Sequence, residues 1–259
     1  MVRDEEDVIV PVVCHLIAEG VDHVLIADNL SKDRTRARLD ELARELPVTV
    51  VDDPDPAFQQ GKKMTSLART AGAAGAGWII PFDADELWVA QGLPVAEYLR
   101  SLDRCDVSVA HLLNHRPPLL PHRDVFAAMK WRDREIGDPK VAFRYAEDVS
   151  LRNGSHSVAS ERALTRDDSG TLRIHHYPNR SLRQTVRKYR QGGAALALTD
   201  LDPVVGSHWR LHAGRSSARI AVTYLRMALR RPRVLDRRLP SRLPVDTHLP
   251  GAGRSFGSR

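Results

Sequence analysis

The sequence predicts an α/β fold in which a mostly parallel β-sheet is flanked by helices. Short apolar runs alternate with amphipathic stretches along the first two-fifths of the chain, polar acidic turns follow two of these runs, and 42% of the 259 residues are hydrophobic. Strands that alternate with helices are typical of parallel sheets, because each helix carries the chain back over the sheet. Ligands in such folds bind beyond the carboxyl ends of the strands. The acidic turns are therefore the first candidates for a site.

The elements of this part are predicted by hydrophobic spacing. Apolar residues recur at helical intervals from Val8 to Ile17, and Gly20 is a stop signal. Pro11 fits this helix only in its first turn, where the missing N–H has no intrahelical partner. We further expect strands at 24–27, 48–51 and 78–80, and helices at 39–46 and 62–76.

The second half of the chain is less regular. We expect strands at 107–113, 140–145 and 172–177, a basic helix at 181–191 that ends at Gly192-Gly193, and an amphipathic helix at 218–229. Four prolines and three glycines beyond Arg230 predict a disordered tail. The chain then divides into one domain at 1–200, a helical extension at 201–231 and a basic Pro/Arg-rich tail at 232–259.

Composition narrows the class of protein. No stretch approaches the ~18 apolar residues that cross a membrane, and the acidic N-terminus is unlike a signal peptide. Cys14 and Cys105 lie far apart, so neither a disulfide framework nor a zinc knuckle is expected, and we expect a cytoplasmic protein.

The formal net charge of +6 is concentrated in the C-terminal part. From Arg210 onward, twelve arginines stand against Asp236 and Asp246, so the rest of the chain is mildly acidic. This distribution favours a solvated tail, or a peripheral contact with the anionic inner face of a membrane, over nucleic-acid binding.

The acidic turn Asp83-Ala84-Asp85-Glu86 carries the most chemistry. Its two aspartates follow an apolar run and can both face a ligand where the strand breaks into a turn. Hard divalent cations bind such oxygens, and a diphosphate can complete the coordination. The cation would act as a Lewis acid on the charge that grows as a diphosphate leaves. A solvated loop is the alternative, but apolar residues on both sides argue against it.

A second polar turn runs from Asp28 to Thr35, directly after the strand at 24–27. Short acidic and amide side chains at a strand end can read a base or a ribose by hydrogen bonding. The alternative is a simple strand–turn–helix connection, in which Ser31 or Asp33 caps the following helix.

Five motifs occur in a characteristic order over roughly residues 1 to 195. They are Arg3-Asp4-Glu5, Gly20-Val21-Asp22-His23, Asp28-Asn29-x-Ser31-x-Asp33-x-Thr35, Asp83-Ala84-Asp85-Glu86, and His176-Tyr177-Pro178-Asn179-Arg180-Ser181 followed by Lys188 and Gly192-Gly193. In this order the chain resembles glycosyltransferase family 2, whose members have the GT-A, Rossmann-like fold. The turn at 83–85 then corresponds to the family's DxD motif.

The resemblance implies a role for each matching residue. Asp28 and Asn29 would contact the nucleoside, with Arg3 near the base or the phosphates. Asp83 would contact the ribose, and Asp85 would bind Mn²⁺ or Mg²⁺. The remaining implied roles are phosphate binding by Lys62, Arg180 and Lys188, and a further metal ligand, either His156 or His176.

The proton acceptor is less determined. An inverting transfer needs one carboxylate within hydrogen-bond reach of the acceptor hydroxyl. Glu86 is the preferred candidate because its neighbours place it in the site. The other candidates are Asp133, Glu135, Glu147 and Asp148.

The chain departs from the family pattern at two places. Only Met1 and Val2 precede Arg3, so the first strand of the fold is expected to be truncated. Leu30 and Arg34 replace glycines that are usual in the Asp28–Thr35 turn, which therefore takes another shape or accepts strain.

The expected activity is transfer of a sugar, of the hexosyltransferase class and inverting, from a nucleotide-sugar donor to an unknown glycan, lipid or small-molecule acceptor. A nucleotidyltransferase is one alternative, but the sequence has no Gly-rich phosphate loop near its N-terminus. The other alternative is a non-catalytic protein that keeps a decayed GT-A fold and binds anionic surfaces through its basic tail.

Overall fold

The computed structural model describes residues 1–120, 122, 124–134, 136–231 and 233–236. The α-helices are α1 (Ile9–Ala18), α2 (Thr35–Glu45), α3 (Gln60–Ala73), α4 (Val95–Ser101), α5 (Val125–Ala128), α6 (Leu182–Leu196), α7 (Ser207–Ala213) and α8 (Ser217–Leu229). The strands are β1 (Val24–Asp28), β2 (Val48–Asp52), β3 (Trp78–Ile79), β4 (Glu86–Ala90), β5 (Val107–Asn114), β6 (Trp131–Asp133), β7 (Gly137–Arg144), β8 (Ser150–Leu151), β9 (Val158–Ala159), β10 (Arg166–Asp167), β11 (Leu172–His176) and β12 (Arg233–Leu235). A 3₁₀ turn, η1, spans Asn153–Ser155.

The described strands form one larger mixed sheet and three two-stranded sheets, β1–β2, β6–β12 and β8–β9. β1 and β2 pair in parallel, and Val2 adds a single parallel bridge to Asp28. The larger sheet has the order β3-β7-β5-β11-β4, with β10 also on β5, and only the β5–β11 and β5–β10 pairings are parallel. The expected mostly parallel sheet is therefore found only at β1 and β2. Between β5 and β7 the chain has no long crossover helix, so β7 returns antiparallel.

Most of the predicted elements are confirmed, including α1 through α3, the strands β5, β7 and β11, and α8. Two further expectations, about α6 and the tail, were wrong. The helix α6 does not end at Gly192-Gly193 but continues through both to Leu196. The segment 233–236 does not belong to a loose tail, because β12 pairs with β6; residues 237–259 lie outside the described residues.

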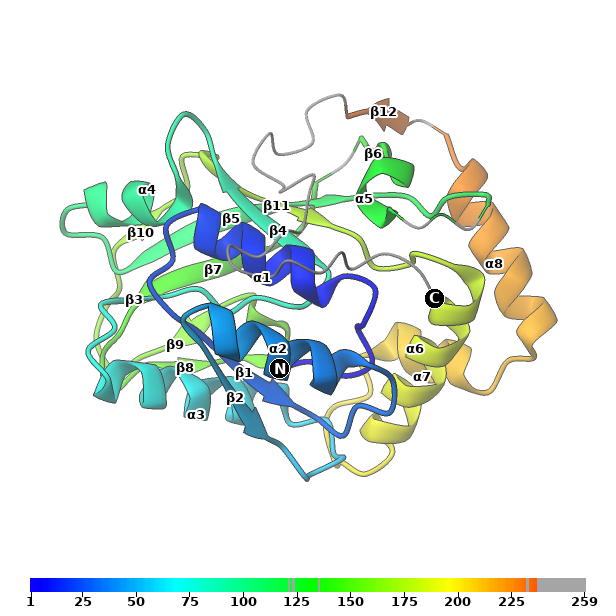
Figure 1. Ribbon diagram of the computed structural model, residues 1–259, viewed down its shortest axis with the longest axis horizontal. Coiled ribbons are helices and arrows are strands. Elements are labelled where there is room, and N and C mark those ends of the chain that lie inside the picture. Colours follow the sequence, from blue (N-terminus) through cyan, green and yellow to red (C-terminus); the bar gives the residue numbers. More distant parts are fainter. Residues whose placement is uncertain (121, 123, 135, 232, 237–259) are drawn as a thin grey trace.

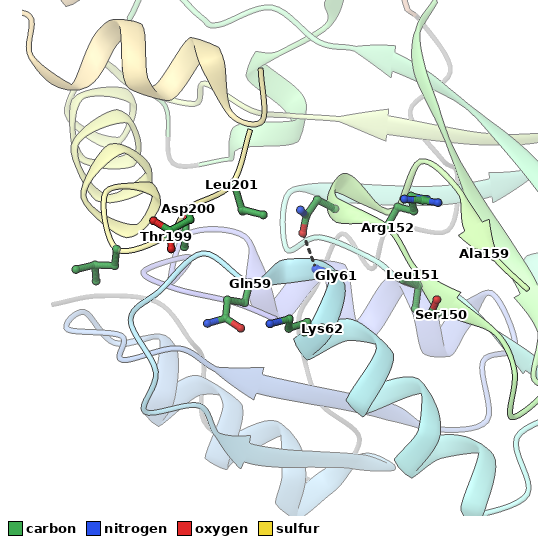
Figure 2. Close-up of a pocket in the computed structure, with 12 residues that line it drawn as sticks. Gln59, Gly61, Lys62, Ser150, Leu151, Arg152, Ala159, Thr199, Asp200 and Leu201 are labelled. Atoms are coloured by element: carbon green, nitrogen blue, oxygen red, sulfur yellow. Dashed lines mark hydrogen bonds between the residues drawn. The ribbon is translucent and has the colours of Figure 1, made fainter. Parts of the chain in front are cut away.

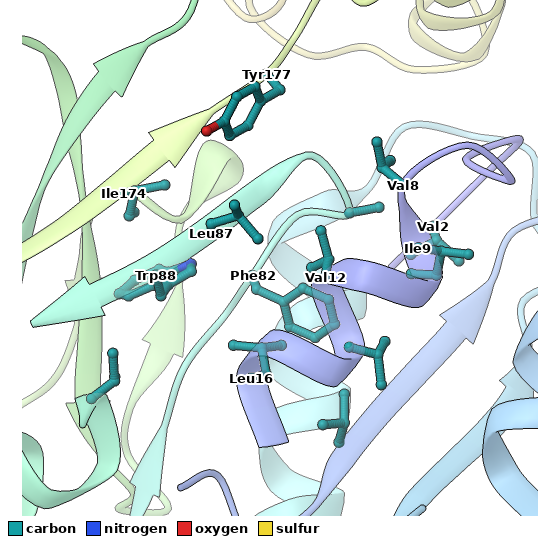
Figure 3. Close-up of a cluster of buried hydrophobic side chains, with 14 of the residues drawn as sticks. Val2, Val8, Ile9, Val12, Leu16, Phe82, Leu87, Trp88, Ile174 and Tyr177 are labelled. Carbon is teal, nitrogen blue, oxygen red and sulfur yellow. The ribbon is translucent and has the colours of Figure 1, made fainter. Parts of the chain in front are cut away.

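The helix α1 supplies the centre of the main core. Its residues Ile9, Val12 and Leu16 are fully or almost fully buried, and Figure 3 shows Val12 and Leu16 near Phe82, with Ile9 beside Val2. Pro11 lies in the first turn of this helix, as its chemistry requires. Because the residues on either side of the acidic turn belong to this core, the turn is anchored at both ends.

Figure 1 shows how the helices are arranged around the sheets: α6, α7 and α8 gather at one end of the molecule, and α4 lies at the other. Packing of α6 against both α7 and α8 holds that end together. Among the described residues, no helix is long and apolar enough to span a bilayer.

Candidate functional site

The acidic turn connects β3 to β4, and two lysines, of which Lys140 is buried, pair with its carboxylates. Lys140, on β7, places its Nζ 2.5 Å from Asp83 Oδ2 and 2.5 Å from Glu86 Oε1. Glu86 Oε2 also accepts a hydrogen bond from the backbone N–H of Asp83, at 3.1 Å. Burial works to raise the pKa of Asp83, but the Lys140 ammonium outweighs it and holds that pKa below its usual value.

Asp85 lies at the centre of a second charged cluster. Its Oδ2 is 2.5 Å from Lys188 Nζ, 3.7 Å from His176 Nε2 and 3.7 Å from Arg180 Nη1. Burial would raise the pKa of Asp85, but Lys188, His176 and Arg180 together bring it well below its ordinary value. Asp85 is thus an ionised carboxylate that is 3% exposed and surrounded by nitrogen groups.

Strand pairing brings the late histidine to this turn. β11 lies antiparallel to β4 with His176 opposite Glu86, and parallel to β5 with His176 opposite Asn114. The Asn114 side-chain oxygen, 2.7 Å away, accepts the proton of His176 Nδ1. That hydrogen bond leaves Nε2, the nitrogen that faces Asp85, as the one able to ligate or accept.

The Arg3-Asp4-Glu5 motif ties the polar turn after β1 to the site. Asp4 Oδ1 accepts hydrogen bonds from the backbone N–H groups of Lys32 (2.6 Å) and Asp33 (3.1 Å). The backbone N–H of Glu5 donates to Thr35 Oγ1 at 2.8 Å. Two of the motifs singled out from sequence are therefore one interlocked structure.

Glu5 itself points to the Asp85 cluster through Arg180. Arg180 donates a close hydrogen bond to Glu5, and its Nε and Nη2 donate to the two oxygens of Asp7 at 2.8 and 3.0 Å. Burial raises the pKa of Glu5 to about 7, against the opposing effect of Arg180 and Lys188. Glu5 is consequently a carboxyl group that titrates near neutrality beside Asp85.

The turn after β1 is held by amide and ammonium groups. Asn29 Nδ2 donates to Asp53 Oδ2 at 2.9 Å and to the backbone oxygen of Asp55 at 2.7 Å, and Lys63 Nζ is 2.7 Å from Asp53 Oδ2. Leu30 has φ +59°, so the replacement of glycine is accommodated with backbone strain.

A cavity of about 670 Å³ lies at the start of α3 (Figure 2). One wall is the start of α3, including Gln59 and Lys62; the others come from the β8–β9 region and from residues 198–201. Gln60 joins this wall to the turn, because its Nε2 donates to Asp83 Oδ1 at 3.2 Å and its Oε1 accepts from the Gly154 N–H at 3.0 Å.

The structure brings some of the predicted site residues together at the acidic turn and places others elsewhere. Asp83, Asp85, Glu86, His176 and Arg180 come together, and Lys62 lines the cavity at the start of α3. Asp28 and Asn29 are buried at the end of β1.

For three of the predicted site residues, the contacts in the structure favour a different role from the expected one. His156 is exposed and hydrogen-bonds the backbone oxygen of Pro139 at 2.8 Å, so His176 is the better-placed metal ligand of the two. The Arg180 guanidinium is engaged by Glu5 and Asp7, which favours a role in positioning them over phosphate binding. Glu86 is fully buried with both carboxylate oxygens engaged, which favours a structural role; proton acceptance by Glu86 stays a prediction.

Arg3 keeps a ligand-binding capacity, because its buried Nε has no hydrogen-bond partner among the described residues. Its role near a base or phosphate also stays a prediction.

Sequence reasoning missed four residues of the site: Glu5 as a titratable group, Gln60, Asn114 and Lys140. Lys140 begins the strand that the sequence predicts at 140–145, and a lysine directly before the apolar run Val141-Ala142-Phe143 is the signal that could have identified it. Nothing in the sequence shows which strand Asn114 faces.

The Asp85 cluster has two groups that fit a divalent cation. Asp85 Oδ2 and His176 Nε2, 3.7 Å apart, can both reach one ion at bond lengths of ~2.0–2.2 Å, and His176 has the second hydrogen bond typical of a metal ligand. Lys188 competes for the same oxygen. Asp85 and His176 would therefore supply two ligands to a cation, with Lys188 as the group that competes for the Asp85 oxygen.

Comparison with solved structures finds similarity to S. aureus TarS 1–349, at 11% identity over 87% of this chain and 71% of that chain, with a TM-score of 0.43. A second similar structure is the same protein in complex with UDP, at 12% identity over 86% of this chain and 68% of that chain, with a TM-score of 0.40. No protein-family model and no curated protein matches the sequence.

Proposed function

We propose that this protein is a metal-dependent glycosyltransferase that takes its sugar from a nucleotide-sugar. The observation that carries the proposal is the convergence on Asp85. The acidic turn, the late His176, the N-terminal Glu5 and the α6 residue Lys188 are far apart in sequence and interact around this one carboxylate. A solvated acidic loop would not gather these partners, and their order along the chain is the one that resembles glycosyltransferase family 2.

The donor diphosphate is proposed to lie between the acidic turn and the cavity at the start of α3. The first turn of α3 offers a positive helix end there, and the exposed Lys62 adds a mobile cation. Asp28 and Asn29 are proposed to position the nucleoside, and Arg3 to use its unpaired Nε on the base or phosphates. Asp83, which contacts Lys140 and Gln60, is proposed to accept hydrogen bonds from the ribose hydroxyls.

Asp85 and His176 are the residues that would hold Mn²⁺ or Mg²⁺. When bound, the ion supplies Lewis-acid stabilisation of the charge on the leaving diphosphate. Lys188, once released from Asp85, can contribute an ammonium to the same charge. The chain's own residues thus orient the donor and offset the negative charge that develops on it.

The acceptor hydroxyl needs a proton acceptor, and Glu5, which pairs with Arg180 in the Asp85 cluster, joins Glu86 as a candidate. A base works best when its pKa is near the operating pH, and the pKa of Glu5 is about 7. Glu86 shares its carboxylate between Lys140 and the backbone of the turn. We propose an inverting transfer of the hexosyltransferase class, as the resemblance to glycosyltransferase family 2 implies, with the acceptor left as a glycan, lipid or small molecule.

The proposal is tested by Asp85→Asn. We expect binding of nucleoside diphosphates in the presence of Mn²⁺, measured by isothermal titration calorimetry, to fall at least tenfold, because a metal ligand loses its charge while keeping its size. A survey of diphosphates of the common nucleosides would identify the donor. The fold should persist, because asparagine keeps the size of the side chain, Arg180 keeps its pairs with Glu5 and Asp7, and Lys188 is partly exposed.

Asp22→Asn is the matched control, since Asp22 forms an exposed ion pair with Arg100. It should bind as the parent does. If Asp85→Asn binds diphosphate and Mn²⁺ like the parent, or if no nucleotide binds the parent at all, the proposed function is wrong.

A further inference from the structure

Two neighbouring histidines point to opposite faces of β11. Successive side chains of a strand alternate between its two faces. His176 faces Asp85 and Asn114, whereas His175 faces His115, which follows β5. The side of the sheet away from the Asp85 turn therefore has its own cluster of nitrogen groups, which the proposed glycosyl transfer does not use.

The cluster consists of two buried imidazoles and one carboxylate. His115 Nε2 and His175 Nδ1 are 2.9 Å apart, and His175 Nδ1 is 3.8 Å from Asp236 Oδ2. One ligand atom from each of the three residues lies within 4.8 Å of the others. His115 and His175 are 2% and 6% exposed, so their shared environment excludes most water.

The hydrogen bonds at this cluster leave one proton shared between the two imidazole rings. His115 Nδ1 must donate its proton to the backbone oxygen of Met129, 2.6 Å away, so in the neutral ring Nε2 carries a lone pair. His175 Nδ1 then donates to that lone pair. A metal ion could take the place of this single proton, which would move to His175 Nε2. The geometry is near to that of two ligands on one ion, since nitrogen atoms on tetrahedral Zn²⁺ are roughly 3.3 Å apart at Zn–N of about 2.0–2.1 Å.

The surroundings are those of a closed site. Tyr177 stacks on His115 with ring centroids 4.3 Å apart, and Phe126 packs edge-on against Tyr177 at 4.8 Å. The hydroxyl of Tyr177 is buried and has no hydrogen-bond partner among the described residues. Arg132 Nε also contacts Asp236 Oδ2, at 3.0 Å, but a carboxylate has about four lone-pair positions and can serve an arginine and an ion together.

We propose that His115, His175 and Asp236 form a site for a transition-metal ion such as Zn²⁺, separate from the Asp85 turn. Two imidazoles and one carboxylate suit zinc better than Mg²⁺ or Ca²⁺, which prefer oxygen ligands. His115 and His175 belong to the central sheet region, and Asp236 follows β12. The ion would therefore link Asp236, at the end of the described residues, to the two histidines of the sheet.

The test measures metal binding without any substrate. Full-length protein freed of metal by a chelator is titrated with Co²⁺, whose visible absorption reports a tetrahedral site, and then with Zn²⁺, which should displace it. We expect one site with this signature. Asp236→Asn and, separately, His115→Gln should each lower Zn²⁺ affinity by at least about tenfold.

Two controls separate this site from others. His176→Ala alters only the Asp85 side and should leave the Co²⁺ signature unchanged. Asp168→Asn removes the carboxylate of the surface pair with His111, a histidine–aspartate contact of 2.8 Å, and should also have no effect. Circular dichroism confirms that each variant is folded. The proposal is overturned if the parent takes up no Co²⁺ or Zn²⁺, or if the uptake survives Asp236→Asn and His115→Gln.

Discussion

At the scale of single residues, the acidic turn is a set of carboxylates held by two lysines. Lys140 forms ion pairs with Asp83 and Glu86, and Lys188 forms an ion pair with Asp85. The two lysines differ in how deeply they are buried, and their roles differ accordingly. The Lys140 side chain is 6% exposed and its pairing is structural, whereas that of Lys188 is 24% exposed and can move when a ligand arrives.

Lys140→Met is expected to destabilise the fold by about 3–5 kcal/mol, because it leaves buried carboxylates without a counter-charge. The pKa of Glu86 is already raised by burial, against the opposing effect of Lys140, so the variant should take up a proton there. A raised pKa in the folded state penalises stability only above the unfolded value, so the loss should be smaller at pH 5 than at pH 8. Urea unfolding at both values measures this. Lys130→Met, at an exposed lysine, should change stability by no more than about 0.5 kcal/mol at either pH.

Glu5 predicts a pH dependence of stability in the parent protein itself. Its pKa in the folded state is about 7, above the ordinary value of 4.5, mainly because of burial. The contribution of Glu5 to stability is therefore complete below about pH 4.5 and is lost as the pH rises through 7. Glu5→Gln cannot ionise and should flatten this part of the curve of unfolding free energy against pH. Identical curves for parent and variant would contradict the raised pKa.

At the scale of elements, the glycine pair of α6 shows how packing overrides a local signal. Gly192 and Gly193 predict a helix stop from sequence, yet α6 runs through both. A Cβ at Gly193 would lie 2.3 Å from Ala213 Cβ, and one at Gly192 would lie 2.5 Å from the Trp209 ring. The glycines allow α7 to approach closely, which one sequence segment considered alone cannot reveal.

Gly193→Ala is expected to destabilise the protein by about 1–3 kcal/mol through overpacking. Helix propensity alone predicts the reverse, a gain of up to about 1 kcal/mol. The measurement is the melting temperature, with hydrogen exchange in α7 as a local readout. Gly214→Ala is the matched control, since nothing lies within 4 Å of a Cβ there. A more stable Gly193→Ala variant would show that α7 does not pack tightly on α6.

The elements that the sequence predicted well are those with a strong period of their own. β1, α2, β2 and α8 are bounded by turns and have apolar residues at regular spacing. The missed elements are short, such as β8, β9 and α5, and their residues are ordered by neighbours rather than by local preference. The same reason explains the sheet: periodicity indicates a strand but not its direction, so the antiparallel β7 was not anticipated.

At the scale of the whole molecule, the candidate site is a product of topology. The sequence motifs identified the acidic residues of the site, because carboxylates that can bind a cation are recognisable from residue type alone. They did not name Lys140 or Asn114, whose positions depend on β7 and β5 lying in one sheet. Nor could they decide between His156 and His176; the pairing of β11 with β4 favours His176.

The last prediction concerns how the chain closes on itself. The segment at 233–236 pairs with β6, the Arg233 guanidinium lies 4.4 Å from the centre of the Trp131 ring, and Arg132 contacts Asp236 at 3.0 Å. Removing it would uncover the edge of β6 and leave Arg132, which is 21% exposed, without that carboxylate. We expect a chain shortened to residue 231 to be less stable by about 1–3 kcal/mol than one shortened to residue 236.

Both shortened chains are compared by thermal melting with a chelator present, which keeps any metal contribution out of the difference. Arg132→Met in the 236-residue chain should reproduce part of the loss, and in the 231-residue chain it should have a smaller effect, because the partner is already gone. Equal melting temperatures for the two shortened chains would mean that β12 rests on the body without stabilising it. The body of the protein would then end at α8, where the sequence places the start of the tail.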